Sequence, residues 1–294
     1  MPEINFLMDS STKLILGTVQ FGLNYGVNNQ SGQVSKESVE TILSLAGNKG
    51  IKILDTSSAY GASEKVLGEV LKENDMKFRI ISKYPRSSRS VKTIFEESLY
   101  TLNQKKLYGY LIHHFDFFRE KQGMWREFLS LKEEGKVTKI GFSLYNVDEL
   151  KFLLDRDITF DILQFPYNIF DRQFEEFFPL LKERNVEIHV RSVFLQGLFF
   201  KPLKNFEGKL LPLRKYVESL HSYCKVHCLK IEELALGYVY SSEYTNGVLI
   251  GVDTKEQLES NIKNLGYNIL LEDIDFVRSI EIKEKELLSP VNWK

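Results

Sequence analysis

The segment Ile51–Gly61, IKILDTSSAYG, decides the fold that this chain is expected to adopt. Its apolar start is typical of a short strand, and Asp55 closes that strand. A polar turn then carries Tyr60, and Ser63 is predicted to cap the helix that follows. Ligands of parallel α/β proteins bind at the carboxyl ends of strands, so this segment indicates a site. Taken alone, however, these residues are also typical of an ordinary polar strand end followed by a solvated turn.

The rest of the chain repeats this strand-and-helix unit. Short apolar runs predict strands near residues 13–18, 51–55, 79–83, 107–112, 137–142, 160–164, 186–190 and 247–250. Amphipathic segments predict helices near residues 35–48, 63–72, 89–103, 123–134, 147–154, 173–184, 213–240 (with a break) and 254–264. Eight such units in 294 residues predict one single-domain (β/α)8 TIM barrel that spans residues 1–294.

A doubly wound dinucleotide-binding fold is the competing α/β architecture. It would place the pattern Gly-x-Gly-x-x-Gly directly after the first strand. Here Gly17–Gly22 reads GTVQFG, which lacks that pattern. A dinucleotide would therefore bind to the strand ends and loops of a barrel, with its phosphates near the last two strands.

Composition excludes several classes of protein. The 39 basic and 40 acidic residues give a net charge of −1, so no broad basic field for nucleic acid is expected. No apolar run approaches the about 18 residues of a membrane span, and Met1–Leu7 lacks the basic start of a signal peptide. We expect a soluble, cytoplasmic protein without a membrane or nucleic-acid partner. The sequence assigns no oligomeric state.

The two cysteines lie close together, at Cys224 and Cys228. On a helix they would share a face with His221, which is part of a zinc-ligand pattern. A structural zinc site usually needs four protein ligands, and no further ligand is evident nearby. We therefore expect two ordinary thiols and no metal site.

Two later strands also end in chemically active residues. Arg79–Lys83 ends in Lys83, and Tyr108–His113 ends in His113. Three successive strands would thus bring Asp55 with Tyr60, Lys83 and His113 to one face of the barrel. This set resembles the catalytic tetrad of the aldo-keto reductases. Further segments resemble that family in the same order, namely Leu14–Thr18, Tyr60–Glu64, Gly141–Ser143, Gln164–Asn168, Gln196–Leu198 and Gly251–Asn261.

The resemblance implies reduction of an aldehyde or ketone to an alcohol by hydride transfer from a nicotinamide. Tyr60 would be the general acid, and a nearby ammonium would lower its pKa from about 10. Lys83 would supply that charge, with Asp55 as its ion-pair partner. His113 would orient the substrate carbonyl. His114 is the rival for this role, but His113 directly follows its strand, as the family's catalytic histidine does.

The resemblance also implies which residues hold the cofactor. Ser143 and Gln164 match residues that hold the nicotinamide carboxamide. Directly after that Ser the family usually has an Asn, and this chain has Leu144. Arg191, before Ser192, stands where the family often places an aromatic ring against the nicotinamide. A guanidinium can stack on a planar ring, but its charge would lie near a ring that is cationic when oxidised. The remaining cofactor positions are Gly17, Thr18, Gln196, Gly197, Leu198, Gly251, Asp253, Thr254, Gln257 and Asn261.

The choice between the two cofactors depends on Asp253 and Thr254. Many members of the family place basic residues there, against the 2′-phosphate of NADP. Asp253 would repel that phosphate unless its side chain points away, and Lys255 could compensate. NADP(H) is the first expectation from the resemblance, and NAD(H) is the alternative.

Other functions and substrates stay open at this stage. A cofactor-binding regulatory subunit of the same fold, with little turnover, is the main alternative, and an unrelated barrel lyase or hydrolase is another. The loop Asn24–Asn29 and the terminal Asn292-Trp293 would suit a polar, sugar-like carbonyl compound. The aromatic residues of His114–Phe118 would either line the substrate pocket or pack against a helix.

Overall fold

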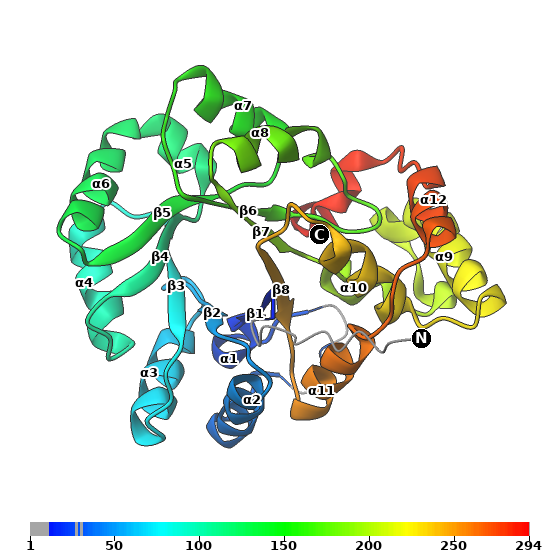
Figure 1. The fold of residues 1–294 in the computed structure, drawn as a ribbon, viewed down its shortest axis with the longest axis horizontal. Helices are drawn as coiled ribbons and strands as arrows, with labels where there is room; N and C mark the ends of the chain where they lie inside the picture. Colours follow the sequence, from blue (N-terminus) through cyan, green and yellow to red (C-terminus); the bar gives the residue numbers. More distant parts are fainter. Residues whose placement is uncertain (1–11, 27–28, 30–31, 294) are drawn as a thin grey trace, which may run out of the picture.

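The computed structural model describes residues 12–26, 29 and 32–293. Within these residues eight parallel strands pair in chain order, and β8 (Gly247–Gly251) pairs back onto β1 (Leu14–Gly17). The sheet is therefore closed, and Figure 1 shows the helices arranged around it. The predicted (β/α)8 barrel is confirmed. The segment Met1–Leu7, on which the signal-peptide argument rested, lies outside the described residues.

The other six strands agree with the predicted positions to within a few residues. They are β2 (Ile53–Asp55), β3 (Arg79–Tyr84), β4 (Leu107–Ile112), β5 (Val137–Ser143), β6 (Ile162–Pro166) and β7 (Glu187–Arg191). Ile81, Leu111 and Ile162 form a buried cluster of their own inside the barrel. Alternating residues such as Tyr110 and Leu163 belong to the larger core instead. Successive side chains of a strand point to opposite faces, so the strands are buried on both sides.

Nine helices of the described chain match predicted segments. They are α2 (Lys36–Asn48), α3 (Ser63–Glu73), α4 (Val91–Thr101), α6 (Trp125–Glu133), α7 (Val147–Asp155), α8 (Phe178–Glu183), α9 (Arg214–Val226), α10 (Ile231–Ser241) and α11 (Lys255–Asn264). Four of them begin with a side chain that accepts a hydrogen bond from the amide three residues on. These caps are Ser35, Ser90, Asn146 and Thr254, and they satisfy amides that have no partner within the helix.

Three helices were not predicted: α1 (Val19–Gly22), α5 (Phe115–Glu120) and α12 (Leu271–Ser279). The first two are too short for an amphipathic period to be visible. In α12 the ring of Phe276 stacks on Tyr223 of α9, so a tertiary contact holds this polar segment. Short 3-10 segments complete the chain at Gln122–Met124, Glu175–Phe177, Leu195–Phe200, Leu203–Asn205, Gly208–Leu213, Lys285–Leu288 and Pro290–Trp293.

The predicted cap of α3 is wrong. Ala62 holds the N-cap position without a side-chain hydrogen bond, and Ser63 is the first helical residue. The Ser63 hydroxyl instead donates to Thr18 O at 2.9 Å and pairs with Thr56 Oγ1 at 3.0 Å. It therefore ties α3 to the ends of β1 and β2, close to Asp55.

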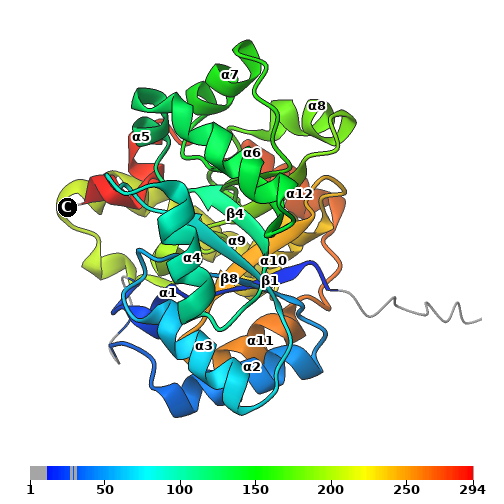
Figure 2. The same ribbon diagram turned by 90° about the vertical axis from the view of Figure 1, so that its left-hand side faces the viewer.

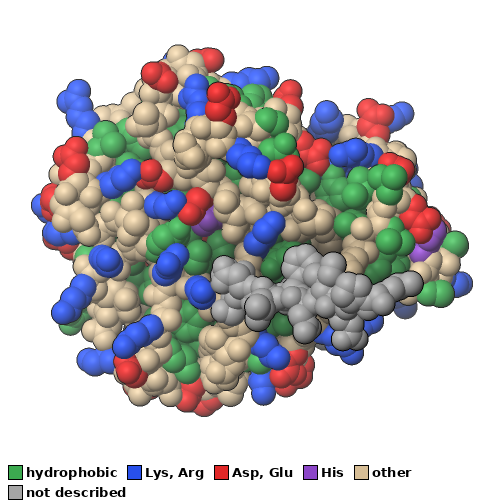
Figure 3. Space-filling view, in the orientation of Figure 1, with side chains coloured by type: hydrophobic (Ala, Val, Ile, Leu, Met, Phe, Trp, Pro, Cys, Tyr) green, Lys and Arg blue, Asp and Glu red, His purple; other side chains and the backbone are tan. Residues whose placement is uncertain are grey.

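The carboxyl ends of the strands form one end of the molecule. In Figure 2 the C-terminal segment lies at the left, on the side away from the start of β1. Acidic and basic side chains are interspersed over the face in Figure 3, as the near-zero net charge leads one to expect. No helix in the described part of the chain has the length and apolar character needed to cross a membrane.

Candidate active site

The centre of the candidate site is a buried ion pair between two neighbouring strands. Lys83 Nζ, from β3, donates to Asp55 Oδ1 at the end of β2, at 2.5 Å. It also donates to Thr56 O at 2.9 Å. Both charged side chains are almost completely shielded from solvent, and a buried charge is stable only with such partners.

The second carboxylate oxygen of Asp55 is held from across the barrel. Gln164 Nε2, from β6, donates to Asp55 Oδ2 at 2.8 Å. Thr18 donates from its backbone nitrogen and from Oγ1 to Asp55 O, each at 3.0 Å. Side chains of β3 and β6 thus hold the two carboxylate oxygens of Asp55, and Thr18 holds its backbone carbonyl. The sequence assigned Gln164 and Thr18 to the cofactor, and in this structure both contact Asp55.

Two glycines bring Tyr60 next to this pair. A Cβ atom on Gly22 would lie 1.8 Å from Tyr60 O, so only glycine allows the loop after β1 to approach so closely. Gly61 has φ of +54°, in the left-handed region that favours glycine. The Tyr60 ring then lies with its centroid 5.2 Å from Lys83 Nζ.

His113 packs edge-on against Tyr60, with 5.5 Å between the ring centroids. Its Nδ1 lies 3.1 Å from Ser57 Oγ. Ser57 Oγ also accepts a hydrogen bond from Ala59 N at 3.1 Å, and its own proton is available for Nδ1. When Ser57 donates to Nδ1, His113 carries its hydrogen on Nε2 and is a donor there. His114 lines the neighbouring cavity instead.

The electrostatics of this cluster are dominated by the loss of water. Burial lowers the pKa of His113 to about 2, and the Lys83 charge adds to this effect. Burial also lowers the pKa of Lys83, although Asp55 opposes the change. The pKa of Tyr60 is raised by burial and by Asp55, and the Arg191 guanidinium opposes that rise. The direction is opposite to the lowering that the resemblance implies, chiefly because burial raises the pKa of Tyr60 and the nearby Asp55 carboxylate adds to the rise.

A second wall of the site is built from the ends of β5 and β7. Arg191 Nη2 donates to Leu144 O at 3.0 Å, and the guanidinium carbon lies 4.4 Å from the centroid of the Tyr145 ring. Ser143 and Leu144 are both buried. The two departures from the family pattern, Leu144 and Arg191, are thus in direct contact.

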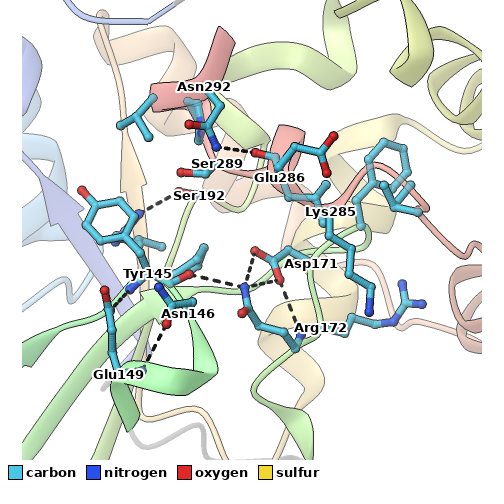
Figure 4. Close-up of a pocket in the computed structure, with 18 of the residues that line it drawn as sticks. Tyr145, Asn146, Glu149, Asp171, Arg172, Ser192, Lys285, Glu286, Ser289 and Asn292 are labelled. Atoms are coloured by element: carbon cyan, nitrogen blue, oxygen red, sulfur yellow. Dashed lines mark hydrogen bonds between the residues drawn. The ribbon is translucent and has the colours of Figure 1, made fainter. Parts of the chain in front are cut away.

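A cavity of about 840 Å³ opens beside this wall. The C-terminal residues Ile280–Asn292 provide much of its lining, with His114, Phe115 and Asp116 on another side. Figure 4 shows Tyr145, Asn146 and Glu149 at the left and the C-terminal residues at the top. Phe117 and Phe118 are buried outside it, so only the start of the aromatic segment lines the cavity.

The remaining predicted cofactor positions lie at or after the ends of β7 and β8, apart from Gly17, which ends β1. Ser192, Gln196 and Gly197 all have positive φ, whereas the Leu198 side chain is buried in the core. Gly251 ends β8, and Thr254 caps α11. The other three contact protein groups or are buried: Gln257 Oε1 accepts from Asp253 N at 2.7 Å, Asp253 Oδ1 accepts from Asn29 Nδ2 at 3.1 Å, and Asn261 is buried.

Comparison with known proteins identifies the family. The model of the Aldo/keto reductase family matches residues 13–282. The chain belongs to this family. Curated relatives include L-galactose dehydrogenase of Arabidopsis thaliana, 26% identical over 89% of this chain and 88% of the relative. Pyridoxal 4-dehydrogenase of Microbacterium luteolum is 22% identical over 85% of this chain and 88% of the relative.

Solved structures of aldo-keto reductases share the fold. The aldo-keto reductase AKR11C1 from Bacillus halodurans, in its holo form, superposes with a TM-score of 0.74. The two sequences are 23% identical, and the match covers 92% of this chain and 94% of the AKR11C1 chain. Aldo-keto reductases are oxidoreductases that use nicotinamide cofactors, so this chain belongs to a family of nicotinamide-dependent enzymes.

The residues at the strand ends fit such a cofactor. Gln20 of α1 lies beside Gly251, and its Oε1 is buried without a hydrogen-bond partner among the described residues. A Cβ atom on the adjacent Gly251 would lie 2.6 Å from Gln20 Nε2, so any larger residue there would displace the Gln20 amide. The N-terminus of α11 follows directly, and its free amides favour an anion such as a phosphate.

Sequence reasoning missed several residues of the site. Ser57 lies between Asp55 and Tyr60, but nothing in the sequence pairs it with His113. Tyr25 contacts Gln196 Nε2 through its hydroxyl at 2.6 Å, and Tyr145 lies under Arg191. The two aromatic residues of the loop after β1 were a usable signal for Tyr25, whereas Tyr145 required the register of β5 and β7.

The cysteine and histidine cluster does not form one face. Cys224 is buried in α9, and Cys228 is exposed beyond its end. His221 Nε2 lies 2.7 Å from Phe199 O. No group of three or more His, Cys, Asp or Glu residues in the described ranges is arranged to hold a metal ion.

Proposed function

We propose that this protein is an NAD(P)H-dependent carbonyl reductase or alcohol dehydrogenase in which Tyr60 is the general acid. The supporting observation is the buried Lys83–Asp55 pair directly beneath the Tyr60 ring, with His113 at its edge. A structural role alone does not explain four polar side chains gathered at the ligand-binding end of a barrel.

The cofactor supplies a hydride to the carbonyl carbon, and the protein supplies a proton to the carbonyl oxygen. Tyr60 keeps its proton at neutral pH, because burial raises its pKa. As the oxygen gains negative charge, the phenol donates to it and becomes a phenolate, and the Lys83 ammonium below the ring then stabilises that charge. His113 donates from Nε2 to the same oxygen and orients it.

We propose a polar, sugar-like carbonyl compound as the substrate class. The cavity surface is largely apolar, but its lining includes the polar side chains of Asn146, Gln173, Ser289 and Asn292. Hydroxyl groups of a substrate could exchange hydrogen bonds with these side chains. The relative named for L-galactose supports the same class. Of the predicted loop Asn24–Asn29, residues 27 and 28 lie outside the described residues.

For the cofactor, NADP(H) remains the first proposal on family grounds, with weak discrimination against NAD(H). Asp253 accepts a hydrogen bond from Asn29 and lies before the N-terminus of α11. Lys255 Nζ lies 3.8 Å from Glu259 Oε1, so its charge is partly compensated. Neither residue is a dedicated partner for a 2′-phosphate.

A screen of the purified protein tests the function. It combines NADPH or NADH with aldehydes and ketones, including sugar aldehydes and simple aromatic aldehydes, and follows loss of the reduced cofactor. Turnover with at least one polar carbonyl compound is expected. Cofactor binding without turnover across the panel would favour the regulatory subunit, and no cofactor binding would favour an unrelated barrel enzyme.

A further inference from the structure

Arg191 is a half-buried cation whose direct contacts carry no opposite charge. Its guanidinium donates to Leu144 O at 3.0 Å, lies 3.4 Å from Ser192 Oγ and stacks over the Tyr145 ring. In the described part of the chain, none of the ion pairs includes Arg191. Its charge is therefore fixed in place by a carbonyl and a ring, and it is not neutralised at contact distance.

The strand register places this charge next to the proposed nicotinamide residues. Ser143 of β5 pairs with Gln164 of β6, and Arg191 of β7 pairs with Pro166, two residues further along β6. Its electrostatic influence also reaches the reacting end of the site. The Arg191 charge lowers the pKa of Tyr60 and of His113, although burial dominates both shifts.

Two carboxylates face the same region and weaken the field. Glu149 and Asp171 both line the cavity with Arg191, and the guanidinium lowers the pKa of each. Burial acts in the opposite direction and raises the pKa of Asp171 to about 6. Near neutral pH the wall therefore carries a positive charge at Arg191, with negative charge further into the cavity.

We propose that Arg191 makes this protein discriminate between the redox forms of its cofactor, binding the reduced nicotinamide more tightly than the oxidised one. This inference rests on the proposed function, because it needs a nicotinamide beside Ser143 and Gln164. The oxidised ring carries a positive charge and the reduced ring is neutral, so a fixed guanidinium nearby weakens binding of the oxidised form alone. An aromatic residue at this position exerts no such selective repulsion.

Selective repulsion of the oxidised cofactor would affect both its release and the equilibrium of the reaction on the enzyme. Weaker binding of the oxidised form speeds its release after reduction of a carbonyl. It also shifts the equilibrium on the enzyme toward reduced cofactor and carbonyl. A tenfold difference between the two dissociation constants raises the potential of the bound cofactor by about 30 mV, the two-electron value.

Calorimetric titration with NADP⁺, NADPH, NAD⁺ and NADH tests the inference without turnover. The wild type should bind the reduced form of its preferred cofactor about tenfold more tightly than the oxidised form. Arg191→Met should bring the ratio close to one, chiefly by strengthening the oxidised form. Arg191→Lys keeps the charge and should keep most of the difference.

Lys285→Met is the matched control, because it removes one exposed positive charge from the lining of the same cavity. Its redox ratio should equal that of the wild type. Equal affinities for both forms in the wild type would overturn the inference without any variant, even if Arg191→Met fails to fold. An unchanged ratio in a folded Arg191→Met would overturn it too, while leaving the proposed function intact. A wild type that binds neither cofactor would overturn both.

Discussion

The two walls of the site are built in opposite ways. On the β2–β3 side, Asp55 and Lys83 are buried, paired at 2.5 Å, and held by Gln164 and Thr18. On the β5–β7 side, Arg191 contacts only uncharged groups and borders an open cavity. The first wall follows the family pattern residue by residue, whereas the second departs from it at Leu144 and Arg191.

This difference indicates a division of labour. In the proposed function the β2–β3 wall transfers a proton, and its charges must balance, because a buried unpaired charge costs several kcal/mol. In the same proposal the β5–β7 wall binds the cofactor, and a net charge there changes the affinity for the cofactor with little effect on the stability of the fold. The regulatory-subunit hypothesis predicts instead that only cofactor binding matters, so that the first wall serves stability alone.

The largest expected effect separates these two views. Tyr60→Phe removes one hydroxyl and keeps the ring, so folding and cofactor binding should survive. Turnover should fall by about 10²–10⁴-fold, the usual contribution of general acid catalysis. The measurement is the rate of carbonyl reduction at saturating cofactor. Retention of more than about a tenth of wild-type turnover would exclude Tyr60 as the acid.

Lys83→Met should reduce turnover and stability together. It leaves the buried Asp55 carboxylate without its cation, which should lower the free energy of unfolding by about 3–5 kcal/mol. Urea unfolding measures this, with Lys182→Met as control, because the Lys182–Glu243 pair is exposed and its loss should change the stability little. The turnover losses of Lys83→Met and Tyr60→Phe should not add in the double variant. Additive losses would mean that the two residues act in separate steps.

The sequence predicted the first wall and the barrel for the same physical reason. Buried parallel strands are short apolar runs, and a polar residue directly after such a run must lie at the carboxyl end. Asp55, Lys83 and His113 could be located in this way. The contact of Arg191 with Tyr145 could not, because it depends on which strands are neighbours and how their registers align. The caps show the same limit: Thr254 caps its helix locally, whereas Ser63 forms contacts with residues from two other strand ends.

A smaller effect is expected for the choice between NADPH and NADH, which depends on Asp253 after β8. Because Asp253 replaces a basic residue, the preference for NADPH over NADH should stay below about a hundredfold, or roughly 2.7 kcal/mol. Asp253→Asn keeps the oxygen that accepts from Asn29 and removes the charge, so it should raise this preference severalfold. Fluorescence titration of both reduced cofactors measures the ratio. Asp157→Asn, at an exposed acid in the loop before β6, should leave the ratio unchanged. A wild-type preference above a hundredfold would contradict this role of Asp253.

A modest expected effect on stability tests how far water reaches the half-buried His113. The pKa of His113 is lowered to about 2 in the folded protein, whereas an unfolded histidine has a pKa near 6.5. Below pH 6.5 the unfolded chain therefore binds a proton that the folded protein does not, and stability falls as the pH decreases. Between pH 7.5 and pH 5.5 this linkage amounts to about 1.4 kcal/mol.

His113→Gln should remove that dependence, because glutamine does not titrate but keeps a donor and an acceptor near Ser57. Urea unfolding at the two pH values gives the loss of stability for each protein, and the wild type should lose about 1.4 kcal/mol more than the variant. His114→Gln is the control, since His114 is less enclosed and should produce a smaller difference. Equal losses in the wild type and His113→Gln would mean that water reaches the imidazole in the folded protein. His113 could then become protonated between pH 5.5 and pH 7.5, and the space beside Tyr60 would be an open, solvated pocket.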